Sequence, residues 1–111
     1  MRQGIVKYNG IRAGLLTEED NGEYLFIYDE MFIKNYPTLF ITFQMPVSER
    51  PYRSKRLFAF FDGLIPEGWL LNIASESWKI NKKDRMGLLL ACCQNAIGAV
   101  SVHNINPTIY E

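Results

Sequence analysis

The centre of the chain carries the run F-F-D-G-L-I-P-E-G-W at residues 60–69, which separates a strand-rich half from a helix-rich half. Gly63 is expected to end a short helix, because glycine disfavours a helix interior. Pro66 suits the first turn of a new helix, where its missing N–H is not needed. These two residues place Trp69 on the opening turn of the second helix.

The residues before this run favour β-strands. Runs at 5–8 and 11–16 flank Asn9-Gly10, a dipeptide that predicts a hairpin with a type I′ turn. Residues 23–28 alternate with a period of two and carry large side chains on both faces, which predicts a strand covered on both sides. Residues 39–45 are also expected to form a strand, ended by a proline that cannot donate to a ladder.

Between and after these strands the pattern favours loops and short helices. One helical turn is expected near residues 31–34, and residues 47–54 read as a polar loop. Ser54 is a candidate cap for a helix over residues 55–62. The helix after Pro66 has Trp78 in its expected buried stripe.

A third helix is expected to begin at residue 81 or 82, with Asp84 near its positive N-terminal end. Its apolar body spans residues 86–93, and residues 97–102 return to a strand. The order of elements predicts an α+β fold over residues 1–111, as a single domain. We expect a small, curled, mainly antiparallel sheet that forms a partly closed barrel, with two or three short helices.

Composition narrows the class of protein. The 111 residues include 12 Lys or Arg and 12 Asp or Glu, so the formal net charge is zero. A neutral domain lacks the positive footprint of nucleic-acid binders, and direct binding of DNA or RNA is not expected. Residues 1–10 lack a signal-peptide core, and no apolar run approaches a membrane span. The adjacent Cys92 and Cys93 make no disulfide framework and indicate reduced thiols in the cytoplasm.

The charges are unevenly distributed along the chain. Acidic residues crowd the first third, at positions Glu18, Glu19, Asp20, Glu23, Asp29 and Glu30. Basic residues dominate later, at positions Arg50, Arg53, Lys55, Arg56, Lys79, Lys82, Lys83 and Arg85. The pattern has two interpretations, solvated loops and helix faces or a dipolar surface that steers a protein partner.

Residues with catalytic chemistry are sparse. The chain has neither a glycine-rich phosphate loop followed by Lys-Ser/Thr nor the H-R-D and D-F-G motifs of kinases. Asp62 with Glu67 forms an acid pair only if the fold brings the two together. Cys93 with His103 is a conceivable nucleophile and base, but an apolar setting raises the pKa of a thiol. His103 has no cluster of metal ligands beside it. We therefore expect no enzyme activity, no cofactor and no metal.

Residues 60–69 closely resemble FFDGLLPEGW, a segment in the N-terminal subdomain of HipA-type serine/threonine kinases, the toxins of bacterial toxin–antitoxin modules. Weaker similarities follow in the same order along most of the chain. They are Tyr8-Asn9-Gly10 with Ala13–Leu16, Tyr24–Asp29, Leu39–Pro46 with Arg50-Pro51-Tyr52, and Leu88–Ala91 with Ile97–Val100. Where the family commonly has a Gly-Arg-Asp-like step before its closing IGAV run, this chain has Cys93-Gln94-Asn95, which removes charge.

The resemblance implies a function in a toxin–antitoxin system. The kinases of the family phosphorylate aminoacyl-tRNA synthetases and pair with a helix-turn-helix repressor of the HipB type. In a split arrangement, the subdomain is a separate small protein, HipS, beside a shortened kinase of the HipT type, and can act as the antitoxin. Because this chain begins near its first strand and ends at Glu111, soon after its last, we expect a HipS-type protein. The alternative is a structural subdomain, or a fragment of a longer toxin, that completes or stabilises the kinase without inhibiting it.

The expected partner-binding residues surround Trp69. A tryptophan on a rigid turn is a common interface anchor, and we expect Trp69 to enter a pocket of the kinase near its nucleotide site. Phe61, Asp62, Glu67 and Gly68 would form its surround. The alternative is that Trp69 is a core aromatic packed on the sheet. Trp78 fits the buried stripe of its helix better, and the core interpretation is stronger there.

Overall fold

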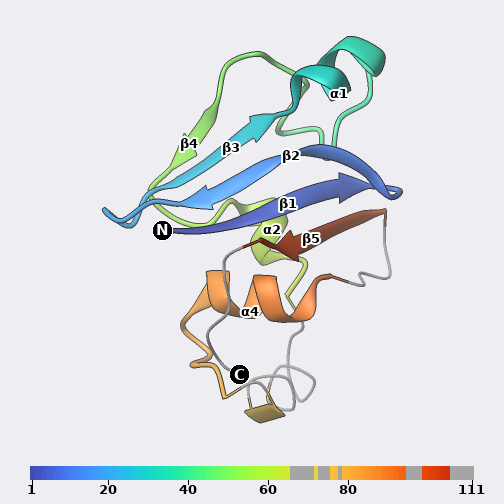
Figure 1. The fold of residues 1–111 in the computed structure, drawn as a ribbon. Helices are drawn as coiled ribbons and strands as arrows, with labels where there is room; N and C mark the ends of the chain where they lie inside the picture. The colour runs from blue at the N-terminus through green and yellow to red at the C-terminus, as the bar shows by residue number, and fades with distance from the viewer. Residues whose placement is uncertain (66–71, 73–75, 78, 95–98, 106–111) are drawn as a thin grey trace.

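One antiparallel sheet organises the fold (Figure 1). The structure, a computed structural model, describes residues 1–65, 72, 76–77, 79–94 and 99–105. The strand order is β4-β3-β2-β1-β5, with β1 at Arg2–Tyr8, β2 at Ile11–Glu18, β3 at Tyr24–Tyr28, β4 at Tyr52–Ser54 and β5 at Val100–Asn104. The described helices are α1 at Glu30–Asn35, α2 at Ala59–Asp62 and α4 at Arg85–Cys92. The expected α+β class is confirmed, but β4 and β5 are open edges and the sheet does not close into a barrel.

The β1–β2 hairpin has the turn chemistry that its sequence predicts. Asn9 has a φ of 48° and Gly10 a φ of 82°, the positive values that a type I′ turn requires. Within β2, Gly14 permits close approach to β3, because a Cβ there would lie 2.4 Å from the carbonyl oxygen of Ile27. A side chain at this position would separate two central strands of the sheet.

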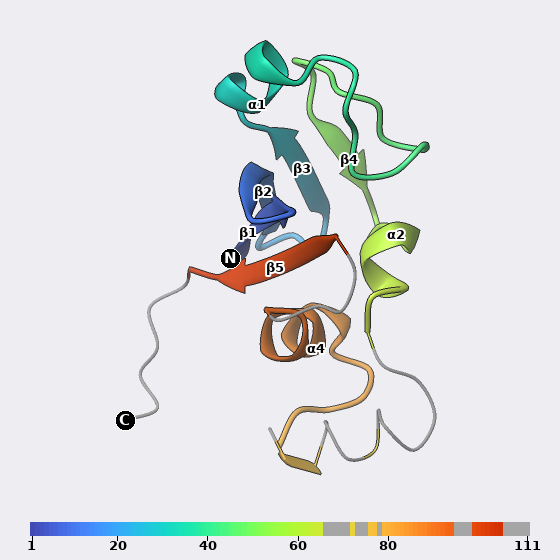
Figure 2. The same cartoon turned by 90° about the vertical axis from the view of Figure 1, so that its right-hand side faces the viewer.

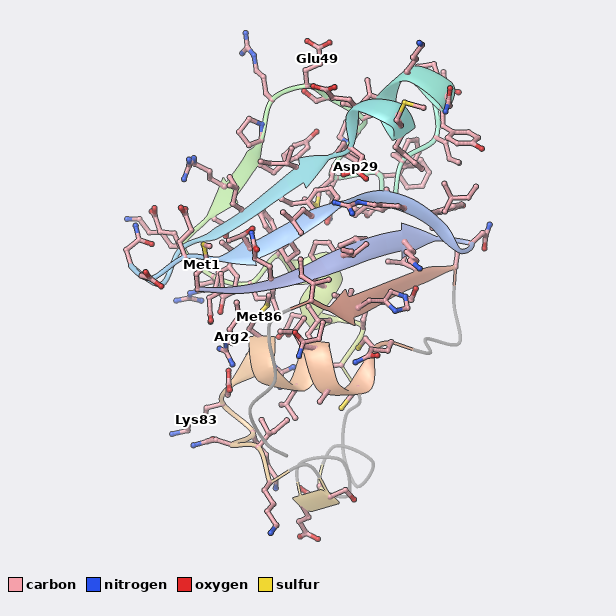
Figure 3. The ribbon with its side chains drawn as sticks, in the orientation of Figure 1. Met1, Arg2, Asp29, Glu49, Lys83 and Met86 are labelled. Carbon is pink, nitrogen blue, oxygen red and sulfur yellow. The ribbon has the colours of Figure 1, made fainter. Side chains whose placement is uncertain are left out.

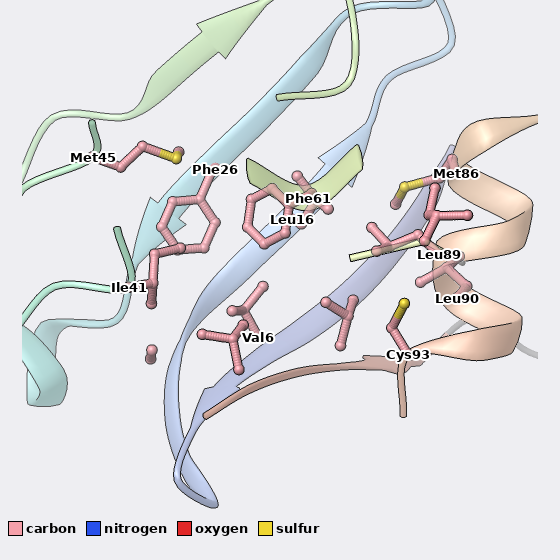
Figure 4. Packing of buried hydrophobic residues seen from close by; sticks show 14 of the residues in the cluster. Val6, Leu16, Phe26, Ile41, Met45, Phe61, Met86, Leu89, Leu90 and Cys93 are labelled. Atoms are coloured by element: carbon pink, nitrogen blue, oxygen red, sulfur yellow. The ribbon is translucent and has the colours of Figure 1, made fainter. Parts of the chain in front are cut away.

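The hydrophobic core lies between the sheet and the helices α2 and α4 (Figure 4). Phe26 and Leu16 from the sheet, Phe61 from α2 and Leu89 from α4 are all fully buried. Helix α4 packs closely against β1 at Gly4, where an added Cβ would be 2.8 Å from Leu90 Cδ2. The apolar body expected in the third helix is therefore confirmed as a buried face. At the far end of β3, α1 and the loop after it stand away from α2 and α4 (Figure 2).

The prediction of a strand at residues 39–45 is wrong. These residues form a loop. Two of its backbone groups form hydrogen bonds with the side chain of Tyr28, the last residue of β3. The Tyr28 hydroxyl donates to the carbonyl oxygen of Met45 and accepts from the N–H of Ile41. The side chains of Ile41 and Met45 are buried. The Tyr28 hydroxyl thus takes the place of strand pairing for this loop. The edge of β3 pairs instead with β4, which lies inside the segment predicted to be a polar loop.

Ser54 and β3 also differ from the structure that the sequence predicts, whereas α1 agrees with it. Ser54 does not cap a helix, because its Oγ accepts from the N–H of Arg56 in a local turn, and α2 begins only at Ala59. The strand β3 is not covered on both faces, since Ile27 is 40% exposed. The single turn expected near residues 31–34 is confirmed within α1. The helix expected to follow Pro66, with Trp78 in its stripe, lies outside the described residues.

Candidate partner-binding site

Asp62 lies where the two halves of the chain meet. It is the last residue of α2, and its Oδ1 accepts a hydrogen bond of 2.6 Å from Nε of Arg85, the first residue of α4. The Asp62 side chain remains 43% exposed and that of Arg85 31%. The pair connects the two helices and presents a carboxylate at the surface.

Phe61 occupies the core beneath Asp62. Its side chain is fully buried, and its ring centroid lies 5.3 Å from that of Phe60 and 5.6 Å from that of Phe26. Tilted and edge-on contacts of this kind stabilise a core beyond the area they bury. Phe61 thus fixes the position of α2 from below and cannot touch a partner without leaving the core.

The chain after Asp62 follows a hydrogen-bonded turn. The N–H of Leu64 donates to the carbonyl oxygen of Phe61 at 3.0 Å, and that of Ile65 to Asp62 at 3.2 Å. Ile65 is buried and holds the end of this turn against the core. The predicted site residues Glu67, Gly68 and Trp69 lie outside the described residues. The role of Trp69 as an interface anchor therefore stays a prediction, with a core position as its alternative.

A surface hollow of about 530 Å³ adjoins Asp62. Its walls come from the β2–β3 turn, the start of β3, the turn after β4, and the ends of α2 and α4. The lining residues are Gly22, Tyr24, Lys55, Arg56, Leu57, Ala59, Asp62 and Arg85. Three of these residues, Lys55, Arg56 and Arg85, are notable in the sequence only as members of the basic run. The register pair of Tyr24 with Ser54, which brings the turn after β4 beside β3, has no signal in the sequence.

A network of charges centred on Arg2, which lies between the sheet and α4 (Figure 3), connects β1 with that helix. The guanidinium of Arg2 donates to both oxygens of Glu18, at 2.7 and 2.9 Å, and to both oxygens of Asp84, at 2.9 and 2.8 Å. The hydrogen bond from Arg2 is the main cause that lowers the pKa of Asp84. Burial, followed by the charge of Glu18, raises the pKa of Tyr24, whose hydroxyl donates to Glu18. The role of this network is structural.

The conceivable cysteine nucleophile does not have the environment that such chemistry needs. Cys93 is 2% exposed, and burial raises its pKa to about 11, as sequence analysis expected for a thiol in an apolar setting. Its Sγ lies 3.5 Å from the carbonyl oxygen of Leu64, whereas His103 Nε2 lies 2.8 Å from Ser101 Oγ. In the described part of the chain no three His, Cys, Asp or Glu side chains converge as metal ligands. None of the described helices combines the length and apolar character needed to cross a bilayer.

Comparison with known proteins gives consistent results. The sequence model of a family described as HipA N-terminal domain matches residues 4–103. An uncharacterized protein of Haemophilus influenzae is 31% identical over 102 residues, which cover 92% of each chain. A solved structure described as the N-terminal domain of HipA toxin is similar with a TM-score of 0.73 and 27% identity, covering 97% of this chain and 96% of that one. The similarity is to the N-terminal domain rather than to a catalytic kinase domain.

Proposed function

Because the chain belongs to the HipA N-terminal domain family, we propose that it is a non-enzymatic, cytoplasmic antitoxin of the HipS type. It binds and neutralises a HipA-like serine/threonine kinase toxin. A helix-turn-helix repressor of the HipB type is the expected third member of the complex.

The observation that carries this proposal is the size of the Haemophilus influenzae relative. The match covers 92% of that protein's length, so the relative consists of little more than this domain. The small size of this relative supports the proposal that the domain is made separately from a kinase and acts on it as a second chain.

The mechanism places Trp69 in a pocket of the kinase near the nucleotide site, with Glu67 and Gly68 beside it. A large aromatic side chain in a fully desolvated pocket supplies much of the binding energy of a typical interface. The described residues support this arrangement through the buried Ile65 and the hydrogen-bonded turn before it, which give the segment a fixed base. Occupation of the pocket keeps the kinase from its active arrangement.

A second candidate function is a structural subdomain that completes the kinase without inhibiting it. The similarity to a domain of HipA toxin itself favours this alternative, because that domain is part of a toxin. Both functions need a surface that faces the kinase, and they differ in the effect of binding on kinase activity.

The test is co-expression of the chain with a HipA-like kinase encoded beside it, scored as growth and as kinase activity. Wild type should restore growth, and Trp69→Ala should lose most of this rescue. Phe43→Ala is a matched control, because Phe43 is 87% exposed and lies on the loop bonded to Tyr28, at the other end of β3 from Tyr24 in the hollow.

Thermal melting of each variant separates lost binding from lost folding. If Trp69→Ala melts like wild type and still rescues growth, the anchor mechanism is wrong. If it unfolds, Trp69 is a core residue.

A further inference from the structure

The hollow beside Asp62 carries positive charge that is not neutralised by ion pairs among the described residues. Of its basic residues, Arg85 is paired with Asp62. Lys55 and Arg56 are exposed, and neither lies within 4 Å of a carboxylate among the described residues. With one acidic and three basic side chains, the lining of the hollow has a formal charge of +2, from Lys55, Arg56 and Arg85 less Asp62.

The backbone holds these two cations at the rim. Ser54 pairs with Tyr24 in the sheet, and its Oγ accepts a 3.2 Å hydrogen bond from the N–H of Arg56. Lys55 is therefore on a short turn whose two neighbours are fixed. Leu57 and Ala59 line the same hollow with apolar surface. The result is a partly apolar hollow with a cationic rim, which suits a segment that carries both carboxylates and apolar atoms.

We propose that this hollow receives an acidic peptide segment of the partner kinase, whose carboxylates pair with Lys55 and Arg56. The inference rests on the proposed function and adds a second contact to it. Asp62 is both a wall of the hollow and the start of the turn that leads to residues 66–69. The acidic segment thus binds beside the turn that leads into the segment carrying the proposed Trp69 anchor.

The charge around the hollow selects a peptide rather than a nucleic acid. Lys55 also lines a smaller hollow, of about 360 Å³, with Glu23, so an acidic turn borders the cationic rim directly. Glu19 lies in the same turn, paired with Arg53 at 3.0 Å. A nucleic-acid backbone extends its negative charge in both directions and would be repelled by this border. A short acidic segment can end before it.

The experiment measures binding of the full chain to the kinase at two salt concentrations. Lys55→Glu with Arg56→Glu should weaken binding at least about tenfold, mainly through slower association, since each reversal turns an attraction into a repulsion. Lys55→Gln with Arg56→Gln should weaken it several-fold and reduce the salt dependence. The matched control is Lys34→Glu with Arg50→Glu, the same change of charge at exposed residues outside the hollow, and it should bind like wild type.

The outcomes separate this inference from the proposed function. If wild type does not bind the kinase, both are wrong. If wild type and the reversed variant bind equally, the hollow is not an interface, while the antitoxin function stands. If the control loses as much affinity as the reversed variant, the effect is one of net charge and the inference fails. Binding of a DNA duplex by wild type that is lost in the reversed variant would overturn the peptide assignment. All variants replace exposed side chains, and circular dichroism verifies their folding.

Discussion

Replacing Asp84 should reveal how strongly the sheet and α4 are held together. Asp84 is the N-cap of α4, and its Oδ1 accepts a 3.1 Å hydrogen bond from the N–H of Gly87. Both of its oxygens also accept from Arg2 at the start of β1. One side chain therefore satisfies an unpaired helix N–H and connects the helix to the first strand.

The magnitude follows from these two contributions. Loss of an N-cap acceptor costs about 1 kcal/mol. The ion pair contributes about 0.5 kcal/mol, because the side chains of Arg2 and Asp84 are 36% and 37% exposed and solvent screens them. Arg2 keeps its bonds to Glu18, so no charge is left unpaired. Asp84→Ala should thus lower the free energy of unfolding by about 1.5 kcal/mol.

Asp84→Asn separates the two contributions. Asparagine is as good an N-cap as aspartate, so this variant should lose only the ion pair, about 0.5 kcal/mol. The assay is urea unfolding followed by circular dichroism, where Asp84→Ala should shift the midpoint by about 1 M and leave the slope unchanged.

The difference between wild type and Asp84→Asn also depends on pH. Because folding lowers the pKa of Asp84 below its ordinary value of 3.8, the stability it contributes is fully present above that value. It is lost as the pH falls through the lower pKa of the folded state. The two proteins should therefore converge in stability as the pH falls below the lowered pKa of Asp84. Equal costs for alanine and asparagine would refute the capping argument, and a difference that grows in acid would refute the ion pair.

Two further predictions concern the core. Gly14→Ala should destabilise the protein by about 1 to 3 kcal/mol, because its Cβ would meet the Ile27 carbonyl oxygen at 2.4 Å and neither strand can yield freely; an unchanged melting temperature would contradict the close approach of β2 and β3. Cys93, with a pKa of about 11, should resist iodoacetamide at pH 8 until the protein unfolds. Peptide mapping of the alkylated protein checks this, and rapid modification of Cys93 in the folded state would disprove its burial.

The parts of the fold that the sequence predicts well are those set by local chemistry. Asn9-Gly10 demands positive φ whatever surrounds it, and the hairpin follows. The apolar run at residues 86–93 predicts a buried body for α4, and Met86, Leu88, Leu89 and Leu90 are buried. Asp84 near the start of this helix is expected from the preference of acids for that end.

The parts that the sequence misses depend on competition between distant segments. Residues 39–45 have strong β propensity, but the free edge of β3 accepts only one neighbour, and the shorter β4 occupies it. The hydroxyl of Tyr28 then satisfies the displaced loop, a contact that no periodicity can reveal. A strand of three residues such as β4 also shows too little alternation to be recognised.

The candidate site divides in the same way. Asp62 is singled out by the motif that contains it, and its side chain is 43% exposed. The burial of Phe61 could not, because adjacent aromatics within a helix point in different directions and only the packing decides which is inside. The pairing of Asp62 with Arg85, 23 residues away, and the hollow beside them arise only from the folded arrangement.

The measurement that tests the central claim most directly is kinase activity of the purified HipA-like partner, titrated with this chain. Neutralisation predicts that activity falls as the chain is added and reaches its floor near equimolar amounts, with Trp69→Ala shifting the curve to much higher concentration. Activity that stays constant or rises, while the two proteins form a complex, would contradict the antitoxin function and identify the chain as an assembly subunit.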